Sequence, residues 1–372
     1  ERLADIADLY KGTGISKDQL SDDGEPCILY GELYTKYKSE TIREVISKTN
    51  IDNTKLVRSK ANDVIIPCSG ETAEDIATAR CVLNGNILLG GDLNIIRLHG
   101  YDGAFMSYQL NGRRKYDIAK VAQGVSVVHL YGEHLKGVKT INPCLEEQKK
   151  IAKLLSLLDE RIATQNKIID KLQSLIKGIS NQLLYANNGI SVLLGEILIE
   201  RSERTKENNQ HEVLSSTVKG IFSQREYFSK DIASENNVGY KIIRLHDVVL
   251  SPQNLWMGNI NYNGKFDVGI VSPSYKIFSI AEGFDKEYIA ATLKTHRALY
   301  NYMLVSEQGA SVVRRNLNME EFEQLVFKIP SFDQQQKIGR TISVLNLRLE
   351  LANKQKTLYE KEKQYLLRQI FI

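Results

Sequence analysis

The sequence has few of the features that mark membrane, secreted or metal-binding proteins. None of its apolar runs approaches the length that crosses a bilayer, and no signal-peptide pattern opens the chain, which begins at Glu1 and not at Met. Its four cysteines, Cys27, Cys68, Cys81 and Cys144, all lie in the first half and show neither CxxC nor histidine spacing. We therefore expect reduced thiols, no disulfide framework, no zinc site, no membrane contact and a cytoplasmic location.

Sequence patterns of common active sites are also missing. The segment Gly12–Lys17 contains two glycines and a lysine but lacks both phosphate-binding patterns, GxxxxGK[ST] and GxGxxG, so we expect a turn. Asn142, Pro143 and Cys144 resemble the Asn-Pro-Pro-aromatic motif of adenine methyltransferases, yet the second proline and the aromatic residue are absent. With no HExxH or GxSxG pattern either, we predict no catalytic residue, no metal site and no cofactor bound by this chain.

The composition is that of an ordinary globular protein. Hydrophobic residues make up 42% and charged residues 25%, and a length of 372 residues allows two or three domains with separate cores. The net charge of +4 is mildly basic. Such a balance permits nucleic-acid binding through local patches without requiring it.

A long amphipathic helix is predicted from Pro143 to Ala186. Apolar residues recur there at alternating spacings of four and three, the seam of a coiled coil. Pro143 suits a helix start, and Glu146 and Glu147 put negative charge in the first turns, where the helix dipole favours it. The seam residues are Ile151, Leu155, Leu158, Ile162, Gln165, Ile169, Leu172, Ile176, Ile179 and Leu183.

The same pattern returns near the C-terminus and reveals a duplicated module. The segment Pro330–Ile338 repeats Pro143–Ile151, and Gln308–Val313 repeats Gln123–Val128 at nearly the same offset. The second seam continues through Ile342, Leu345, Leu349 and Ala352. We therefore predict four parts: a globule in residues 1–142, a long helix in 143–187, a second globule in 188–329 and a second long helix in 330–372.

Each globule is expected to be a mixed α/β domain with short strands. Strands are predicted at Cys27–Tyr30, Val64–Ile66, Ile87–Leu89 and Asn94–Leu98, and at Val248–Leu250, Val268–Val271 and Lys276–Ile280. Helices are predicted at Leu3–Leu9, Asp102–Leu110, Val192–Ile199 and Lys286–Leu304. The fold class is therefore α+β, with two mixed α/β domains separated by two long helices that form an intramolecular antiparallel coiled coil.

Basic and polar residues at equivalent places in the two globules are candidates for contact with DNA. Arginine and lysine suit phosphates and guanine, and small polar or amide side chains at strand ends can reach base edges. Taken singly, a basic cluster is more often a solvated surface and a polar strand end an ordinary turn, whereas recurrence near the same loop favours binding. Trp256, the single tryptophan, suits a core position. The candidates are Lys11, Thr13, Ser69, Gly70, Arg113, Arg114, Lys115, Ser126 and His129 in the first globule and Gln253, Asn254, Arg314, Arg315 and Asn316 in the second.

The chain resembles, over essentially its whole length, the specificity (S) subunits of type I restriction–modification systems. The segment Pro143–Ile162 keeps the family's proline, Glu-Gln-x-x-Ile and Leu-Asp pattern. The second copy begins in the same way at Pro330–Ile338, but Asn346 replaces the aspartate. Asp63–Gly70 resembles the family's strand followed by Ser-Gly, which the corresponding Asp247–Gln253 lacks.

The resemblance implies that each globule is a target recognition domain for one half of a split sequence in double-stranded DNA, with the helices spacing the halves. It also implies docking of methyltransferase (M) subunits, two of them by analogy, and of restriction (R) translocase–nuclease subunits. S-adenosylmethionine, ATP and Mg would belong to those partners, and this chain would be non-catalytic. The implied docking and coiled-coil residues are Gln148, Ile151, Leu155, Leu158, Asp159, Ile162, Ile169, Leu172, Gln335, Ile338, Ile342, Leu345 and Leu349.

Three other interpretations stay open on the sequence. The chain resembles equally the fused recognition chain of a combined nuclease–methyltransferase system. It also fits a non-catalytic coiled-coil scaffold without sequence preference, which a footprint over two short separated DNA segments would eliminate. The third is a methyltransferase or nuclease whose motifs have diverged, and S-adenosylmethionine bound to the isolated chain would favour it.

Overall fold

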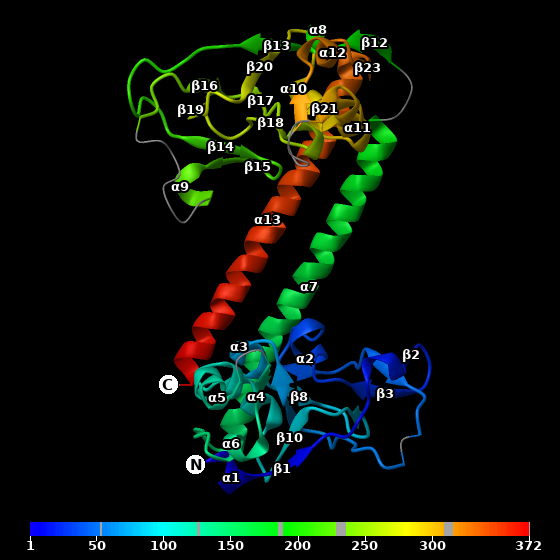
Figure 1. The fold of residues 1–372 in the computed structure, drawn as a ribbon, viewed down its shortest axis with the longest axis vertical. Coiled ribbons are helices and arrows are strands. Elements are labelled where there is room, and N and C mark those ends of the chain that lie inside the picture. The colour runs from blue at the N-terminus through cyan, green and yellow to red at the C-terminus, as the bar shows by residue number, and fades with distance from the viewer. Residues whose placement is uncertain (53, 125–126, 185–188, 228–235, 309–314, 372) are drawn as a thin grey trace. The chain divides into compact units, whose positions relative to one another are not determined.

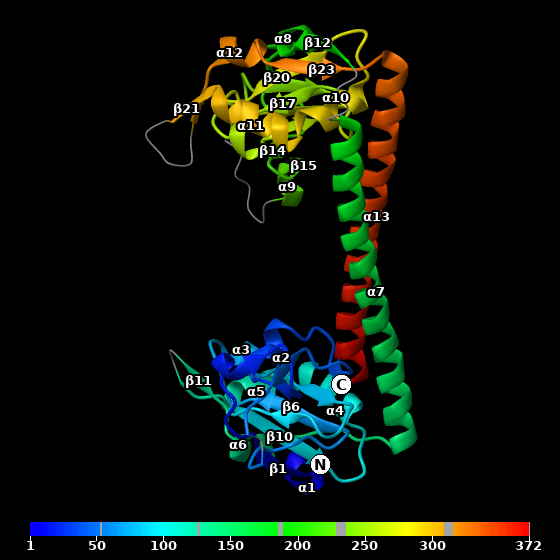
Figure 2. The ribbon, with the colours of Figure 1, turned by 90° about the vertical axis from the view of Figure 1, so that its right-hand side faces the viewer.

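The structure, a computed structural model, describes every residue except 53, 125–126, 185–188, 228–235, 309–314 and 372. The chain divides into two compact units, one formed by Glu1–Ile168 together with Ala352–Ile372 and the other by Ile169–Leu351. We call them unit 1 and unit 2, and each contains part of both long helices (Figures 1 and 2). In the described part of the chain, no helix has the length and apolarity needed to cross a membrane.

Unit 1 is built on two sheets of short strands. The first has the order β1 (Ala7–Lys11), β10 (Leu93–Leu98), β6 (Asp63–Pro67), β8 (Arg80–Val82) and β4 (Thr41–Ile42), antiparallel except between β8 and β4. The second has the order β2 (Leu20–Ser21), β5 (Ser47–Thr49), β3 (Glu25–Ile28) and β9 (Leu88–Leu89). In β6, Val64 and Ile66 belong to one apolar core and Ile65 to another. Both faces of this sheet are therefore covered, which is why β6 reads as a continuous apolar run.

Short helices complete unit 1: α1 (Leu3–Ile6), α2 (Glu32–Thr35), α3 (Ala73–Ile76), α4 (Gly103–Asn111), α5 (Lys115–Val121), α6 (Gly132–Lys136) and the 3-10 turn η1 (Lys17–Gln19). The predicted helix at Asp102–Leu110 is confirmed as α4. Its start is fixed by Asp102, whose carboxylate accepts a hydrogen bond from the backbone N–H of Phe105 at 2.8 Å. Most of α4 is buried, and its residues Phe105 and Tyr108 pack in one apolar cluster with residues of both long helices.

Unit 2 has a four-stranded sheet in the order β13 (Leu198–Arg201), β20 (Lys276–Ile280), β17 (Val248–Leu250) and β18 (Ile260–Tyr262). Two-stranded pairs surround it: β12 (Ile190–Leu193) with β23 (Val326–Ile329), β14 (Leu214–Thr217) with β15 (Gly220–Ser223), β16 (Lys241–Arg244) with β19 (Val268–Val271), and β21 (Ser306–Gln308) with β22 (Arg315–Leu317). The helices are α8 (Leu194–Ile197), α9 (Gln224–Tyr227), α10 (Lys286–Leu293), α11 (His296–Leu304), α12 (Met319–Glu323) and the 3-10 turn η2 (Leu255–Met257).

Three of the predicted helices are wrong in extent. The helices expected at Leu3–Leu9 and Val192–Ile199 shrink to the single turns α1 and α8, because the residues that follow join a sheet as β1 and β13. The helix expected at Lys286–Leu304 is two helices, α10 and α11. The break occurs at Thr295, whose hydroxyl accepts from the N–H of Ala298 at 3.2 Å and so begins a new helix.

The two long helices are α7 (Leu145–Leu184) and α13 (Phe332–Ile370). Within unit 1 they pair antiparallel: Leu155, near the start of α7, packs with Leu367 near the end of α13, while Gln165 donates to the carbonyl of Ala352 at 3.0 Å. Every predicted seam residue of both helices is buried or half-buried. The antiparallel coiled coil expected from the heptads is confirmed; the four domain boundaries stay a prediction.

A glutamine near the start of each long helix ties that helix to its own globule. The Oε1 of Gln148 accepts from the backbone N–H of Asp102 at 3.0 Å, and its Nε2 donates to the carbonyl of Pro143 at 2.8 Å. Gln335 makes the same two bonds in unit 2, both at 3.0 Å, with Asp285 and Pro330. Because Asp102 and Asp285 cap α4 and α10, the two glutamines hold equivalent helices in equivalent places.

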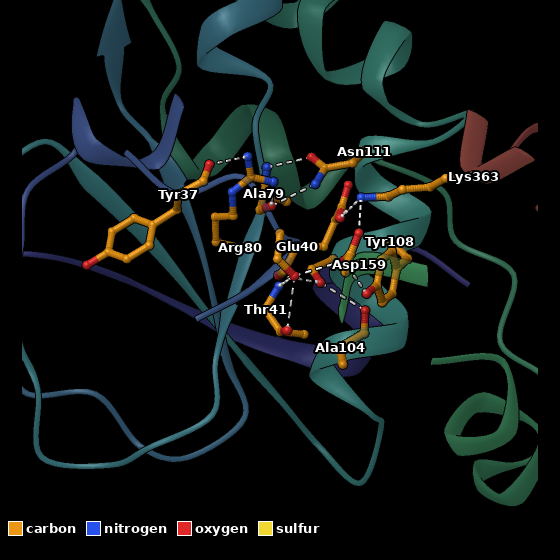
Figure 3. Close-up of polar contacts among 12 residues, drawn as sticks. Tyr37, Glu40, Thr41, Ala79, Arg80, Ala104, Tyr108, Asn111, Asp159 and Lys363 are labelled. Carbon is orange, nitrogen blue, oxygen red and sulfur yellow. Dashed lines mark hydrogen bonds and ion pairs between the residues drawn. The ribbon is translucent and has the colours of Figure 1, made fainter. Parts of the chain in front are cut away.

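The last turns of α13 are held in unit 1 by a buried lysine. Lys363 Nζ donates to Glu40 Oε2 and to Asp159 Oδ1, both at 2.5 Å. The other oxygen of Asp159 accepts from the hydroxyls of Tyr108 at 2.7 Å and Ser39 at 2.8 Å. Figure 3 shows Lys363 reaching from α13 to the two carboxylates, and each of the three charged side chains is at most 10% exposed. We call Lys363, Glu40 and Asp159 the charge lock.

Burial and neighbouring charges set the protonation of the lock. Burial raises the pKa of Glu40 above its usual value, although the charge of Lys363 opposes this. For Asp159, burial is outweighed by the charge and hydrogen bonds of Lys363, and the pKa is lowered. The two carboxylates likewise overcome burial and raise the pKa of Lys363. Arg80, itself buried, acts on Glu40 as a second positive charge, so the buried charges balance.

The charge lock has no counterpart in the sequence of the second copy. Pro143 and Pro330 set an offset of 187 residues (330 − 143), at which Asp159 corresponds to Asn346 and Lys363 to Ile176. The two ends of the helix pair are therefore chemically different, although the module is repeated.

We predict that Lys363→Met destabilises the protein by about 3–5 kcal/mol, because it leaves two buried carboxylates without their ammonium partner. Chemical denaturation followed by circular dichroism measures the loss. The matched control is the double variant D159N/K363M, which should recover most of it since the buried charges that remain, Glu40 and Arg80, balance each other.

The pH dependence gives a second readout of the same lock. The raised pKa of Lys363 means that its contribution is complete below the ordinary lysine pKa and is lost as the pH rises through the raised value. The difference in unfolding free energy between wild type and K363M should therefore shrink at strongly alkaline pH. A K363M protein as stable as wild type at neutral pH would show that the lock does not hold the helix.

Candidate nucleic-acid interface

In unit 1, a hairpin strand pairs with the segment that follows the central strand β6. That segment is β7 (Ser69–Gly70), and it pairs with β11 (Val128–His129) so that Ser69 lies opposite His129. Gln123 begins the hairpin by exchanging backbone hydrogen bonds with His129 at 2.9 and 2.7 Å. We call Ser69, Gly70 and His129 the hairpin site of unit 1.

Unit 2 repeats this arrangement with other side chains. The segment after β17 contains Gln253 and Asn254, and the backbone N–H of Arg315 in β22 donates to the carbonyl of Gln253 at 3.1 Å. Gln308 of β21 lies opposite Arg315, as Gln123 lies opposite His129 in unit 1. We call Gln253, Asn254 and Arg315 the hairpin site of unit 2.

The strands that lead to the two hairpin sites begin in the same way. Asn62 and His246 have positive φ values of 78° and 76°, and each precedes a buried aspartate that opens the strand. Asp63 is held at 2.8–2.9 Å by Arg97 of the adjacent strand β10, whereas Asp247 is held at 2.9 Å by Arg201 of β13, which β20 separates from β17. The turn and the buried aspartate are therefore shared by the two units, and the arginine that binds the aspartate comes from a different strand in each.

Basic and aromatic side chains surround the hairpin site of unit 1. Ser69 Oγ donates to Asp92 Oδ2 at 3.3 Å, and Lys11 Nζ lies 3.9 Å from the other oxygen of Asp92. The ring of Tyr131 stacks on His129 with centroids 6.1 Å apart and is 52% exposed. A cavity of about 240 Å³ opens beside Lys11 and Tyr131. Such a surface can offer a cation to a phosphate and a flat ring to a base.

The hairpin site of unit 2 is built around an arginine that stacks on the tryptophan. The guanidinium carbon of Arg315 lies 5.1 Å from the centroid of the Trp256 ring. Trp256 is half-buried, while its neighbour Leu255 is fully buried in the main core of the unit, so the core position expected for Trp256 is wrong. Gln253 and Asn316 are exposed beside it, and Asn254 precedes the turn η2.

Several candidate DNA contacts lie outside the two hairpin sites. Arg113, Arg114 and Lys115 lie where α4 meets α5, after Gly112, whose added Cβ would come 3.0 Å from the carbonyl of Leu367 in the last turn of α13. The cluster follows the C-terminus of α4, where cations complement the helix dipole, and it also opens α5 at Lys115. Arg114 also pairs with Asp117 at 3.2 Å. Ser126 and Arg314 lie outside the described residues.

The docking residues expected on the long helices are engaged within the chain. Gln148, Gln335 and Asp159 are buried, and their polar atoms bond inside their own units. The expected seam residues are buried or half-buried within the chain, and docking of another subunit at them stays a prediction. They are Ile151, Leu155, Leu158, Ile162, Ile169, Leu172, Ile338, Ile342, Leu345 and Leu349.

A second apolar stripe, missed in the sequence analysis, follows each long helix. Many of the exposed apolar residues stand one position before a seam residue. In an antiparallel pair such positions fall on the same side of both helices. In unit 1 they are Leu154 (49% exposed), Leu157 (43%), Leu358 (64%) and Tyr365 (63%), which we call the apolar face. The heptad phase of these residues was the signal that would have revealed it.

No cluster suited to a metal ion, with three or more His, Cys, Asp or Glu side chains, occurs among the residues that the structure describes. Burial raises the pKa of the Cys27 and Cys68 thiols to about 11, so both are protonated at neutral pH. Cys81 is also buried, and Cys144 is exposed. The Cys27 and Cys68 thiols are therefore not activated thiolates of the kind a nucleophile needs.

Comparison with known proteins gives one family match. Residues 1–174 are similar to the type I restriction modification DNA specificity domain. A curated relative, the type I restriction enzyme MjaVIII specificity subunit of Methanocaldococcus jannaschii, is 27% identical over 183 residues, or 49% of this chain. The chain matches 40% of the length of that relative.

Solved structures agree with the fold of this chain. The match to the crystal structure of the type I restriction–modification S subunit from M. genitalium covers 100% of this chain and 95% of that subunit. Its TM-score is 0.67 and the sequence identity is 16%. A chain from a structure on complex assembly and conformational transition of the type I system covers 99% and 95%, with a TM-score of 0.52 and 12% identity. At these identities the likeness concerns the fold.

The segment between Lys11 and Ile15 supports the structure of unit 1. The turn expected at Gly12–Lys17 is an irregular stretch over residues 12–16, followed by the 3-10 turn η1 from Lys17. The hydroxyl of Thr13 accepts from the backbone N–H of Val57 at 2.9 Å, which gives this candidate DNA contact a structural bond. Gly12 is buried, and a Cβ there would come 2.0 Å from the carbonyl oxygen of Gly90. Gly14 is exposed and has no atom within 4 Å of an added Cβ.

We predict that Gly12→Ala destabilises the protein by about 1–3 kcal/mol, because the backbone of Gly90 must move to admit the methyl group. The matched control, Gly14→Ala in the same segment, should stay within about 0.5 kcal/mol of wild type. Urea unfolding of the two variants measures both values. Equal stabilities would show that the close approach of Gly12 and Gly90 is not needed.

Proposed function

We propose that this chain is the DNA-recognition subunit of a type I restriction–modification complex, and that each unit reads one block of a two-part target in double-stranded DNA. One observation carries the proposal: the same place in two copies of a module bears unlike side chains, Ser69 with His129 and Gln253 with Arg315. Base pairs differ in the donors and acceptors on their edges. Unlike side chains on like frameworks therefore suit two different sequences.

In this proposal the long helices set the distance between the two blocks. Their start is tied to the globules by the glutamines Gln148 and Gln335, and the pairing of α7 with α13 is fixed in unit 1 by the charge lock. Helices held in one register act as a ruler, much as spacing between half-sites follows from protein geometry in other two-headed DNA readers.

The catalytic steps belong to partner subunits in this proposal. Two methyltransferase subunits supply S-adenosylmethionine chemistry, and translocase–nuclease subunits supply ATP- and Mg-dependent cleavage in the restriction complex. The apolar face gives them a docking surface, because a contiguous exposed apolar patch marks sites of protein association. The same geometry would serve a fused nuclease–methyltransferase partner. A scaffold without sequence preference would not need different side chains at the two hairpin sites.

We predict that removing one heptad from each long helix shortens the spacer between the recognised blocks by about 3 base pairs. Seven residues at 1.5 Å rise span roughly 10 Å, and base pairs are about 3.4 Å apart. Deleting Gln165–Lys171 together with Glu350–Lys356 keeps the seam phase and leaves the charge lock intact. Sequencing of methylated sites in cells that carry the variant and its methyltransferase subunit measures the spacer.

The control for this experiment removes the heptad from α7 alone. It mismatches the two helices and should abolish methylation, whereas the paired deletion keeps both blocks and changes only their distance. A folded paired deletion that methylates the original spacer would refute the ruler.

We predict that Leu157→Glu weakens assembly with the methyltransferase subunit at least tenfold, because the variant places a charge in the apolar face without disturbing the seam. The matched control is Lys153→Glu, which adds the same side chain at another exposed position of α7. Analytical ultracentrifugation of chain and partner mixtures gives the affinities. Equal binding by both variants would remove the apolar face as the docking surface.

A further inference from the structure

Arg315 is fixed on several sides in the hairpin site of unit 2. Its backbone N–H donates to the carbonyl of Gln253 at 3.1 Å. Its Nη1 donates to the carbonyls of Met303 at 3.3 Å and Ser306 at 3.4 Å, and the face of its guanidinium stacks on Trp256. A long side chain that is normally free to rotate is thus held in one orientation before any ligand arrives.

The remaining edge of the guanidinium is a pair of parallel donors. Among the described residues, no hydrogen bond engages the Nε or Nη2 of Arg315. The side chain is half-exposed, and a guanidinium has hydrogen-bond donors but no acceptor. Two parallel N–H donors match the O6 and N7 acceptors that guanine presents in the major groove, a pattern that no other base offers. The free edge therefore has the geometry of a guanine reader.

Trp256 is held as firmly as the arginine that it supports. The η2 turn is closed by backbone bonds from Asn259 to Asn254 at 3.2 Å and from Gly258 to Leu255 at 2.8 Å, and Leu255 is fully buried. The indole consequently forms a rigid platform under the guanidinium plane. Stacking of this kind lowers the entropy that Arg315 must lose when it binds.

The equivalent place in unit 1 carries different chemistry. Ser69 and His129 occupy the positions that Gln253 and Arg315 occupy in unit 2, and the segment next to Ser69 contains no tryptophan. A hydroxyl and an imidazole cannot form the arginine fork. The guanine assignment therefore applies to one block of the target and not to both.

We propose that Arg315 reads a guanine in the block recognised by unit 2, and that Trp256 is the positioning residue that holds the arginine fork. The proposal rests on the proposed function and adds to it the identity of one base and the side chain that recognises it. Gln253, whose carbonyl binds the backbone of Arg315, and Asn316, the next residue of β22, are exposed as well.

The test uses the complete chain with its methyltransferase subunits and a duplex carrying the target obtained by methylation sequencing. Each guanine of the two blocks is replaced in turn by 7-deazaguanine, which lacks the N7 acceptor. We expect one position in the unit 2 block to lower wild-type affinity by about 5- to 150-fold. In Arg315→Ala the natural duplex should bind that much more weakly, and the same 7-deazaguanine should have no further effect.

Two further variants distinguish recognition of the guanine from the charge of Arg315 and from its stacking on Trp256. Arg315→Lys keeps the charge and should lose the sensitivity to 7-deazaguanine. Trp256→Ala should reduce that sensitivity while Arg315 is present, and Trp256→Phe should restore most of it. Arg225→Ala, which removes an exposed charge from α9, is the matched control and should keep the full wild-type sensitivity.

The outcomes are distinct. A target whose unit 2 block lacks guanine would overturn the inference, and so would an R315A protein that binds every sequence equally more weakly with a salt slope reduced by about 1, the mark of a phosphate contact. Both results leave two-block recognition intact. If the wild-type complex showed no two-block preference at all, the proposed function itself would fail. Thermal unfolding of each variant confirms that it is folded.

Discussion

A lysine buried between two carboxylates joins the end of this chain to its first half. Removing three charges from water is costly, and the cost is offset only when each charge meets its partner with good geometry. Lys363 from α13, Asp159 from α7 and Glu40 from a loop of unit 1 must therefore meet at one point. Because the last turns of α13 cannot leave without stranding buried charge, they belong to unit 1 as much as the sheet does.

The charge lock has no sequence counterpart in the second copy of the module, although other contacts of the module occur in both copies. Gln148 and Gln335 bind their helix caps in the same way, and the buried Asp63 and Asp247 both follow a residue with positive φ before equivalent strands. The sequence position of Asp159 is taken by an asparagine in the second copy. Shared contacts thus make the two units alike in backbone, whereas the lock gives the helix pair one defined direction and register.

Long periodic elements were predictable, and short ones were not. The heptads locate α7 and α13 because an apolar seam repeated over many turns outweighs local preferences. The start of α4 is predictable because Asp102 is a residue that commonly caps helices. The helices expected after Leu3 and Val192 fail because one turn of helix competes with pairing at a sheet edge, and sheet pairing wins. Thr295 breaks the helix expected at Lys286–Leu304 because its hydroxyl can cap a new helix.

The sequence alone determined the repeat, the two long heptad helices and the family resemblance, since each depends on spacing along the chain. Only the tertiary structure decided which polar residues meet. Glu40 and Lys363 are 323 residues apart, and nothing in their local sequence marks them as partners. The same holds for Ser69 beside His129 and Gln253 beside Arg315. Periodicity can be read from neighbouring residues in the sequence, whereas contacts between distant residues form only when the strands and helices pack together.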